Sequence, residues 1–348
     1  MAYIVFPAVG QDAGVKSLQL KIGDPRFKDK VLDVAPEALY AMETGTIIPF
    51  AKMIQEMKGG QLVYIGETHN SLPMHDIQFK ILQALYEQDR NISIGLEMFP
   101  VTFQDVLNKW SLGILSEEEF IREGQWYVNW NFNFGFYKKI FDLAKANKIP
   151  MVGLNAPREL QTTWDFVMGY NAVKALKKEQ KKMIVLAGSG HLIYNLGINL
   201  RAYEKSRLPG KTVISVFVPK GQKNVRISRS LGDYILGIPE EEKPAYPSVG
   251  LSFKKFKGLE NLVIDSKPID GAAKAADFEK GDVVLVVDGR PWADVNELRT
   301  YLAKFKWEEE TKFRILRNGQ EKDVILKFQE QPAVPAEPKK EEAARWPK

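Results

Sequence analysis

Cysteine is absent from this 348-residue sequence, and histidine is scarce. Without cysteine the chain cannot form disulfides, thiolate zinc sites or iron–sulfur clusters, and it has no cysteine nucleophile. The absence does not identify a compartment, because oxidising compartments also hold proteins without disulfides. Imidazole chemistry is restricted to His69, His75 and His191, the three histidines of the chain.

Long apolar runs and a large excess of one charge are missing as well. No stretch approaches the roughly 20 apolar residues of a membrane-spanning helix. The run Ala2–Val9 has no basic region before it and is short for a signal peptide, so we expect no export signal in this sequence. The 49 basic and 44 acidic residues leave a net charge of +5, which gives no reason to expect a nucleic acid partner.

The length favours two domains, and 45% apolar residues suffice for ordinary buried cores. Residues 239–248 are rich in Pro and Glu, which predicts a linker. We therefore expect one domain over 1–238 and a smaller one over 249–329. The tail, 330–348, is rich in Pro, Ala, Glu and Lys, a composition typical of disorder.

The first predicted domain alternates short apolar runs with helical patterns. Strands are expected at 62–65, 92–96, 150–154, 183–187 and 213–218. Ser71 with Pro73 predicts one helix start, and Ser116 with Glu119 has the spacing of a capping box. Because each strand is apolar on both faces, the pattern indicates an α/β fold with a largely parallel sheet covered on both sides.

Four of these strands are followed directly by residues that can bind ligands: Glu67, His69, Glu97, Asn155, Arg158 and His191. Ligands of open parallel sheets bind beyond the carboxyl ends of the strands, so we expect these side chains at one edge. Both strand-end histidines stand in Gly-x-x-His loops. His75 lies on the helix after the first loop and can reach the same pocket from the side.

Imidazoles and carboxylates are suitable ligands for zinc, manganese, cobalt or iron. A carboxylate beside a histidine can also fix its tautomer or act as a general base, and Arg158 suits a ligand carboxylate or phosphate. Structural roles stay open for each residue. Asn155 can be a turn residue, Arg158 can pair with Glu159, and a histidine on a helix, such as His75, is more often structural.

An aromatic run covers 126–137, where seven of twelve residues are aromatic. Trp126, Trp130 and Tyr137 are its candidate ligand contacts. The run can form a wall for a flat apolar ligand or a surface for a homodimer. Ordinary packing beneath a loop is the alternative.

These motifs and their order resemble the ChaN-like family of haem-binding uptake proteins, within the group of Tiki, TraB and erythromycin-esterase-like proteins. The matching stretches are 64–70, 95–99 with Gln104, 126–137, 153–158 and 188–191. The resemblance implies a three-layer α/β/α sandwich and a bacterial protein of haem or iron uptake. It also implies a periplasmic or outer-membrane-associated location, although the sequence has no cysteine for a lipoprotein anchor.

The same resemblance leaves two functions open. The first is haem or iron-ligand binding, with an axial His or Tyr that the sequence does not identify and with haem between two copies as one arrangement. The second is metal-dependent hydrolysis of a peptide or ester, because the wider group associates paired Gly-x-x-His motifs and a glutamate with this reaction. It implies a polar centre of Glu67, His69, Glu97 and His191, with a divalent metal on Glu67, His69 and His191. A scaffold with a vestigial pocket is a third possibility.

Residues 245–328 resemble a PDZ domain of the type found with bacterial proteases. The stretch that resembles its carboxylate-binding loop is Gly250, Leu251, Ser252 and Phe253. Asp288-Gly289 and Asn318-Gly319 are hairpin turn signals, and a helix is expected over 295–302. The resemblance implies that this small β-rich domain binds a protein's C-terminal peptide by strand addition. A structural β-domain without peptide affinity is the alternative.

Overall fold

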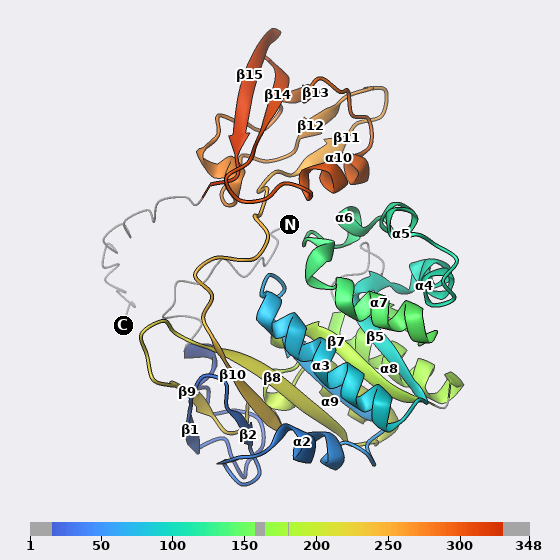
Figure 1. The fold of residues 1–348 in the computed structure, drawn as a ribbon, viewed down its shortest axis with the longest axis vertical. Coiled ribbons are helices and arrows are strands. Elements are labelled where there is room, and N and C mark those ends of the chain that lie inside the picture. Colours follow the sequence, from blue (N-terminus) through green and yellow to red (C-terminus); the bar gives the residue numbers. More distant parts are fainter. Residues whose placement is uncertain (1–15, 157–163, 180, 330–348) are drawn as a thin grey trace, which may run out of the picture. The chain divides into compact units, whose positions relative to one another are not determined.

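The computed structural model describes residues 16–156, 164–179 and 181–329. Arg158 and the predicted tail, 330–348, lie outside these residues. The chain divides into two compact units, Met1–Ala245 and Tyr246–Lys348 (Figure 1). The division falls inside the predicted linker, 239–248.

The first unit is built on an eight-stranded sheet of order β3-β2-β10-β8-β4-β7-β5-β6. Its strands are β2 (Leu39–Ala41), β3 (Thr46–Ile47), β4 (Leu62–Glu67), β5 (Ile92–Pro100), β6 (Met151–Asn155), β7 (Lys182–Gly188), β8 (Gly210–Val218) and β10 (Tyr234–Pro239). From β10 to β6 the neighbouring strands are parallel, whereas β2 and β3 pair antiparallel at one end. A separate antiparallel pair joins β1 (Val31–Val34) to β9 (Val225–Ser228).

Burial explains why the central strands are continuous apolar runs. Every residue of β4, β5 and β7 is buried, as expected for a parallel sheet with helices on both faces. The predicted strands are confirmed, and so is the largely parallel sheet. The strand β5 extends beyond the predicted 92–96 to Pro100, because its pairing with β6 shifts register between Leu96 and Pro100.

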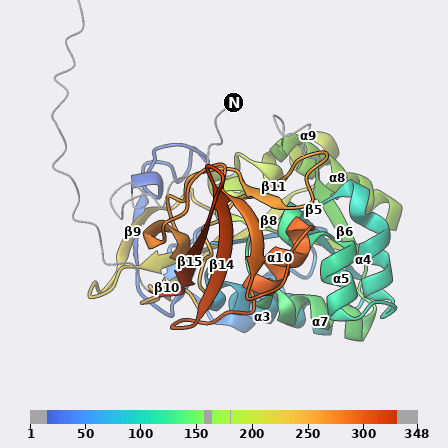
Figure 2. The same cartoon turned by 90° about the horizontal axis from the view of Figure 1, so that it is seen from above.

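The helices form a layer on each face of this sheet. They are α2 (Phe50–Glu56), α3 (Leu72–Gln88), α4 (Gln104–Ser111), α5 (Glu117–Glu123), α6 (Trp126–Asn129), α7 (Lys138–Asn147), α8 (Trp164–Glu179) and α9 (Ile198–Ser206). The chain crosses the sheet one way from β4 to β6 and returns from β6 to β8, so right-handed connections place the outgoing and returning helices on opposite faces. Figure 2 shows α3 and α7 on one side of the strands, and α8 and α9 on the other. The three-layer α/β/α sandwich is therefore confirmed.

Local sequence sets several helix ends as predicted. The Ser71 hydroxyl accepts a hydrogen bond from the Met74 amide at the start of α3, and Ser116 with Glu119 forms a full capping box on α5. Between α8 and α9, a Cβ on Gly169 would lie 2.8 Å from the Arg201 Cβ, so glycine permits the close approach of the two helices. No helix among the described residues is long and apolar enough to cross a membrane.

The second unit is a five-stranded antiparallel sheet of order β11-β12-β13-β14-β15. Its elements are β11 (Phe253–Lys255), β12 (Leu262–Ile264), the 3-10 helix η6 (Ala272–Ala275), β13 (Val283–Val287), α10 (Val295–Leu302), β14 (Glu310–Arg317) and β15 (Gln320–Lys327). Asn318 and Gly319 have φ values of 51° and 79°, which makes the predicted two-residue turn between β14 and β15. The predicted helix over 295–302 is confirmed.

Candidate functional site

The strand order predicts where the first unit should bind a ligand. In this sheet β7 lies between β4 and β5. The chain leaves β7 toward α9 on one face of the sheet, whereas it leaves β4 and β5 toward α3 and α7 on the other face. Neighbouring strands whose connections diverge leave a crevice beyond their carboxyl ends. The loop after β4 carries His69, and the 3-10 helix η4 (Ser189–His191) follows β7. The two Gly-x-x-His loops therefore meet at this crevice from opposite faces of the sheet.

Glu67 ends β4 and lies between two imidazoles. It is 3% exposed, and its Oε1 lies 2.6 Å from Nδ1 of His69. Its Oε2 is 3.6 Å from Nε2 of His75 and has no hydrogen-bond partner, although it is buried. The carboxylate thus orients His69 through one oxygen and leaves the other oxygen available.

His75 is buried behind Glu67 and does not lie at the surface of this edge. It is 1% exposed, its Nε2 donates to the His69 carbonyl oxygen at 3.2 Å, and its Nδ1 lies 3.1 Å from Oε1 of Gln78. Gln78 in turn donates to the carbonyl oxygen of Ile65. Instead of reaching the pocket from the side, as predicted, His75 supports the loop and the carboxylate beneath it.

A second carboxylate–imidazole group lies on the other side of β7. Glu97, in β5, is 3% exposed and accepts from the Gly188 amide at 2.7 Å. Its Oε1 lies 3.2 Å from Nε2 of His191, and the Nδ1 of His191 is 2.6 Å from Oδ1 of Asp165. His191 is therefore held between two carboxylates. Asp165 comes from the start of α8.

These carboxylates change the charge state of both strand-end histidines. Burial disfavours the charged ring of His69, but the charge of Glu67 and its hydrogen bond outweigh burial and raise the pKa of His69 to about 9. Burial also disfavours the charged ring of His191, but its contacts with Asp165 and Glu97 outweigh burial and raise the pKa of His191 to about 10. Burial would raise the pKa of Glu97, yet its bonds to His191 lower it. Near neutral pH the edge therefore holds two imidazolium–carboxylate groups.

The aromatic run divides between the surroundings of His69 and the core. The rings of Trp130 and Phe132 lie 4.7 and 4.8 Å from the His69 ring, centre to centre. Trp126 is fully buried and packs on Phe134, while the equally buried Tyr137 accepts a hydrogen bond from Nε1 of Trp130 at 2.9 Å. This burial argues against the predicted ligand contacts of Trp126 and Tyr137, which the packing alternative explains.

Asn155 also has a structural role. Its Nδ2 donates to the Glu97 carbonyl oxygen at 2.9 Å, and its own Oδ1 accepts from the Ala156 amide at 2.8 Å. It therefore joins the end of β6 to β5 and forms the turn that was the alternative for this residue. The position of Arg158, predicted to bind a ligand, is outside the described residues.

Glycine is required where the two loops meet. A Cβ on Gly188 would lie 2.6 Å from Cε1 of His69, and a Cβ on Gly66 would lie 2.8 Å from the Ser189 hydroxyl. Such contacts are too short for real carbon atoms, so larger residues at these positions would displace the His69 ring or Ser189. The glycines of the two Gly-x-x-His motifs thus permit the histidine and the loops to pack against the strand ends.

Some polar groups near this edge are left without partners. The Trp164 Nε1 and the Ser189 hydroxyl are buried and have no hydrogen-bond partner, like Oε2 of Glu67. Buried polar atoms are normally satisfied, so each exception needs an explanation such as a ligand or water. The Trp164 ring lies 5.8 Å from that of His191, which places one more unsatisfied group beside the histidines.

Four residues of this edge were not predicted from the sequence: Gln78, Phe132, Trp164 and Asp165. Phe132 lies inside the aromatic run, and Gln78 stands three residues after His75, on the same helix face. These two could have been found from spacing. Asp165 and Trp164 could not, because no motif connects the start of α8 to a histidine that follows β7.

The predicted metal set is not assembled as a metal centre. In the described ranges, no group of three or more His, Asp or Glu side chains is arranged to hold a metal ion. The proposed ligands Glu67, His69 and His191 instead belong to two separate carboxylate–imidazole groups. The geometry therefore gives no support to a divalent metal on these three residues.

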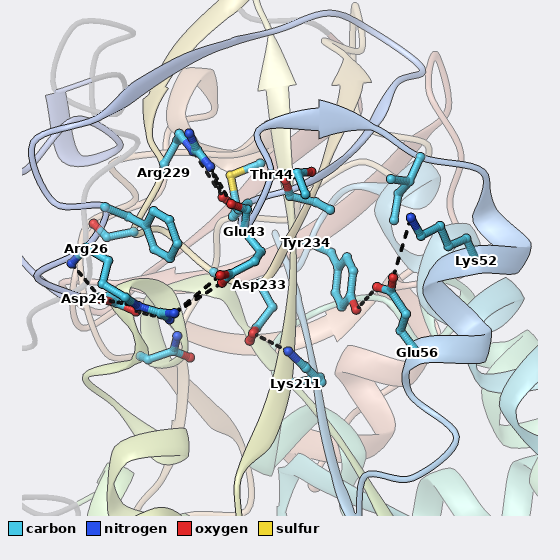
Figure 3. Close-up of a pocket in the computed structure, with 17 residues that line it drawn as sticks. Asp24, Arg26, Glu43, Thr44, Lys52, Glu56, Lys211, Arg229, Asp233 and Tyr234 are labelled. Carbon is cyan, nitrogen blue, oxygen red and sulfur yellow. Dashed lines mark hydrogen bonds and ion pairs between the residues drawn. The ribbon is translucent and has the colours of Figure 1, made fainter.

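A cavity of about 390 Å³ lies at the opposite, amino edge of the same sheet (Figure 3). It surrounds the beginnings of β8 and β10, at Lys211 and Tyr234. Its charged side chains pair with one another or with backbone carbonyls: Asp24, Arg26, Glu43, Lys52, Glu56, Lys211, Arg229 and Asp233. This cavity was not predicted, because segments far apart in the sequence line it.

In the second unit, the predicted carboxylate-binding loop leads into β11. Gly250 has a φ of 74°, and a Cβ there would lie 2.0 Å from the Asp270 carbonyl oxygen, so glycine is required. Leu251 and Phe253 are buried in the core of this unit. Because β11 is at the end of the sheet order, the loop stands at the start of an edge strand.

The first unit is thus a three-layer α/β/α sandwich with a histidine–carboxylate edge, and the second is a small antiparallel β-domain. Residues 53–161 and 159–201 match the family described as haem-binding uptake, Tiki superfamily, ChaN, and residues 247–328 match the PDZ domain family. The chain thus carries a ChaN-type domain of the Tiki superfamily and a C-terminal PDZ domain. No curated protein matches the chain.

Several solved structures are similar to parts of the chain. One, described as cofacial heme binding to ChaN of Campylobacter jejuni, is 18% identical with a TM-score of 0.47, over 60% of this chain and 96% of that one. The type III effector HopBA1 is 12% identical, with a TM-score of 0.42 over 54% and 92%. A serine endoprotease from Yersinia pestis is 23% identical, with a TM-score of 0.22 over 26% and 32%. These TM-scores, all below 0.5, support no conclusion about function.

Proposed function

We propose that the first unit binds haem at the carboxyl edge of its sheet and that His69 is the iron ligand. The observation that carries this proposal is the 2.6 Å contact between Nδ1 of His69 and Glu67. A carboxylate on one ring nitrogen fixes the tautomer and makes the other nitrogen a better metal ligand. Nε2 of His69 is then the atom to coordinate haem iron. Membership of the ChaN-type family supports haem as the ligand.

The surroundings of His69 suit a flat, largely apolar molecule. Trp130 and Phe132 flank its ring, and neither is fully buried. Aromatic rings stack against planar ligands and exclude water from them. His191 is a weaker candidate for the iron ligand, because both of its ring nitrogens already contact carboxylates.

The proposal includes a proton. Without haem, the pKa of His69 is raised to about 9, so the ring is protonated near neutral pH. It must therefore release the Nε2 proton before this nitrogen can coordinate iron. Haem affinity should therefore increase with pH up to about pH 9. The hydrogen bond from Nδ1 to Glu67 can persist throughout.

Haem titration followed by the Soret band tests the assignment. We expect a saturable shift for the wild type, loss of that shift in His69→Ala, and an unchanged titration in Lys211→Ala at the amino edge. Without a saturable shift in the wild type, haem binding is wrong. A His69→Ala titration identical to the wild type would leave haem binding intact but remove His69 as the ligand.

We further propose a role in bacterial haem or iron uptake, in the periplasm or at the outer membrane, with the PDZ domain bound to the C-terminus of a partner protein. The two domain families support this combination. A homodimer with haem between its copies is compatible with the proposal. Cell fractionation tests the location, and a cytosolic protein would contradict the periplasmic or outer-membrane assignment. Light scattering with and without haem tests the oligomeric state.

Hydrolysis of a peptide or ester is the second candidate. It is favoured by two carboxylate–imidazole groups, which can transfer protons, and by the unpartnered Oε2 of Glu67. Glu67, His69, Glu97 and His191 would form the reacting centre. An esterase and peptidase screen should then show activity that both His69→Ala and His191→Ala reduce, and activity that survives both substitutions would exclude this site.

A further inference from the structure

We propose that the PDZ domain has a side-chain subsite beyond the end of β11, which takes a large apolar residue of an acidic peptide. The inference rests on the peptide-binding role proposed above. It adds the chemistry of the partner, which the carboxylate-binding loop alone does not determine. The observation behind it is a cavity of about 490 Å³ in the second unit.

The free edge of β11 sets the path of a peptide. In the described part of the chain, β11 pairs with β12 on one side and ends the sheet on the other. A peptide that adds to this edge with its carboxylate at Gly250–Phe253 runs antiparallel to β11. Its upstream residues then pass Lys255, the last residue of the strand.

The cavity lies where those upstream residues would pass. Lys255 lines it from the strand, and the segment before α10 contributes Pro291, Trp292 and Ala293. The turn after the strand contributes Leu259, Glu260 and Asn261. Lys255 is three residues after Ser252, which corresponds to about 10 Å of extended chain. The subsite should therefore receive a side chain roughly three to five residues before the peptide carboxylate.

The surfaces of this cavity are mostly apolar and are held in place. Trp292 is 5% exposed; its Nε1 donates to the Val287 carbonyl oxygen, and its ring lies 5.0 Å from that of Tyr301. Leu259 is 46% exposed, so its side chain contacts water in the absence of a partner. A large apolar side chain would cover Leu259 and complete the packing around Trp292.

Charge indicates which peptides reach the subsite. Lys254, Lys255 and Lys257 are all exposed along β11 and the turn after it. The Lys255 ammonium donates to the backbone oxygen of Glu260 and not to its carboxylate. The three lysines outnumber the exposed Glu260 carboxylate, so the edge is positive overall. Such an edge favours peptides with Asp or Glu beside the apolar residue. Edge lysines can also serve only to prevent strand pairing, which would make peptide charge irrelevant to affinity.

The test uses the full-length chain and fluorescence anisotropy with labelled ten-residue peptides. The parent peptide is acidic, ends in a free carboxylate, and carries one Phe that is moved through the third to sixth positions from its end. Companion peptides replace Phe by Ala, replace the acidic residues by Lys, or end in an amide. We expect one Phe position to bind about tenfold more tightly than Ala there, and the Lys-rich peptide to bind more weakly.

Variants locate the effect. Leu259→Ala should remove most of the Phe preference, whereas Ile325→Ala, on β15 and similarly exposed at 49%, should leave it unchanged. Lys255→Glu should weaken acidic peptides and strengthen the Lys-rich one. Equal affinity of Phe and Ala peptides at every position, or a Phe preference that survives Leu259→Ala, would overturn the subsite.

Two controls separate this inference from the proposed function. If the amide peptide binds as well as the free carboxylate, peptide capture at Gly250–Phe253 fails, and the subsite fails with it. If the carboxylate is required but Phe is not, only the subsite is wrong. Haem titration of the same preparation reports on the first unit independently of either result.

Discussion

The two edges of the first sheet are both rich in charged side chains, but they differ in how those charges are solvated. At the carboxyl edge, Glu67 and Glu97 are each 3% exposed and pair with imidazoles. At the amino edge, the side chains of Lys52 and Glu56 are 55% and 41% exposed, and Arg26 is 65% exposed. Water screens the second set, whereas the first set must satisfy its charges internally.

The cavity of the first unit and its two strongly perturbed histidines lie at different edges of the sheet. The amino edge has the cavity of about 390 Å³, yet its charged groups are already paired in Figure 3. The carboxyl edge has buried carboxylates, perturbed histidines and an unpartnered Oε2 on Glu67. Perturbed ionisable groups cluster at functional sites, and four substitutions or conditions test the difference between the two edges.

The largest expected effect is at Glu97. Glu97→Gln removes one carboxylate from a buried ion pair, and breaking such pairs costs about 3–5 kcal/mol when the remaining charge has no partner. Because His191 keeps its contact with Asp165, we expect a loss of about 3 kcal/mol, the lower end of that range. Urea unfolding should show this loss in the free energy of unfolding. A loss below about 1 kcal/mol, the range of exposed pairs, would contradict the contrast between the two edges.

Gly188→Ala should have the next largest effect. The new Cβ would lie 2.6 Å from Cε1 of His69, and overpacking of this kind costs about 1–3 kcal/mol. We expect lower stability and weaker haem binding, because the His69 ring must move. Gly190→Ala is the matched control, since nothing lies within 4 Å of its added Cβ. If both variants titrate with haem like the wild type, the ring position of His69 does not matter.

The pH dependence of stability should separate the edges as well. The pKa values of His69 and His191 are raised from 6.5 to about 9 and about 10, so their stabilising contribution is complete below pH 6.5. It is lost as pH rises through those values. The free energy of unfolding should therefore fall between pH 6.5 and 10, and less so in His191→Gln. A wild type as stable at pH 10 as at pH 6.5 would disprove this charge assignment.

The smallest effect is expected at the amino edge. Glu56→Gln removes a charge that accepts from the Tyr234 hydroxyl and lies 3.9 Å from Lys52. Exposed pairs contribute about 0.2–1 kcal/mol, so unfolding should change by no more than that, and the Soret titration should not change. Impaired haem binding in this variant would show that the amino edge takes part after all.

Sequence predicted the parts of the site that follow directly from strand ends. Glu67, His69, Glu97 and His191 come within a few residues of buried strands, and parallel strands bring their carboxyl ends together. Asp165, the hydrogen-bond partner of His191, was unpredictable because its position depends on how α8 lies relative to η4. His75 was placed on the correct helix, but spacing does not tell whether a side chain lines a pocket or supports it from behind.

The fold was predictable for a similar reason. Apolar runs define buried strands such as β4 and β7, and alternation with helices defines a parallel sheet. The short strands β1, β2 and β3 lack that signal, because they have two to four residues and pair antiparallel at the margins. Whether such short segments form strands depends on their tertiary contacts and not on local sequence.

The reversal of strand order at β7 has a mechanical consequence. The loop of His69 continues into α3 on one face of the sheet, whereas the loop of His191 leads to α9 on the other. A molecule seated between the two histidines would therefore contact both of the loops that lead into helices on opposite faces of the sheet. Binding of this molecule should slow amide hydrogen exchange in α3 and α9 together. Protection of both helices at once would show that the bound molecule contacts both histidine loops.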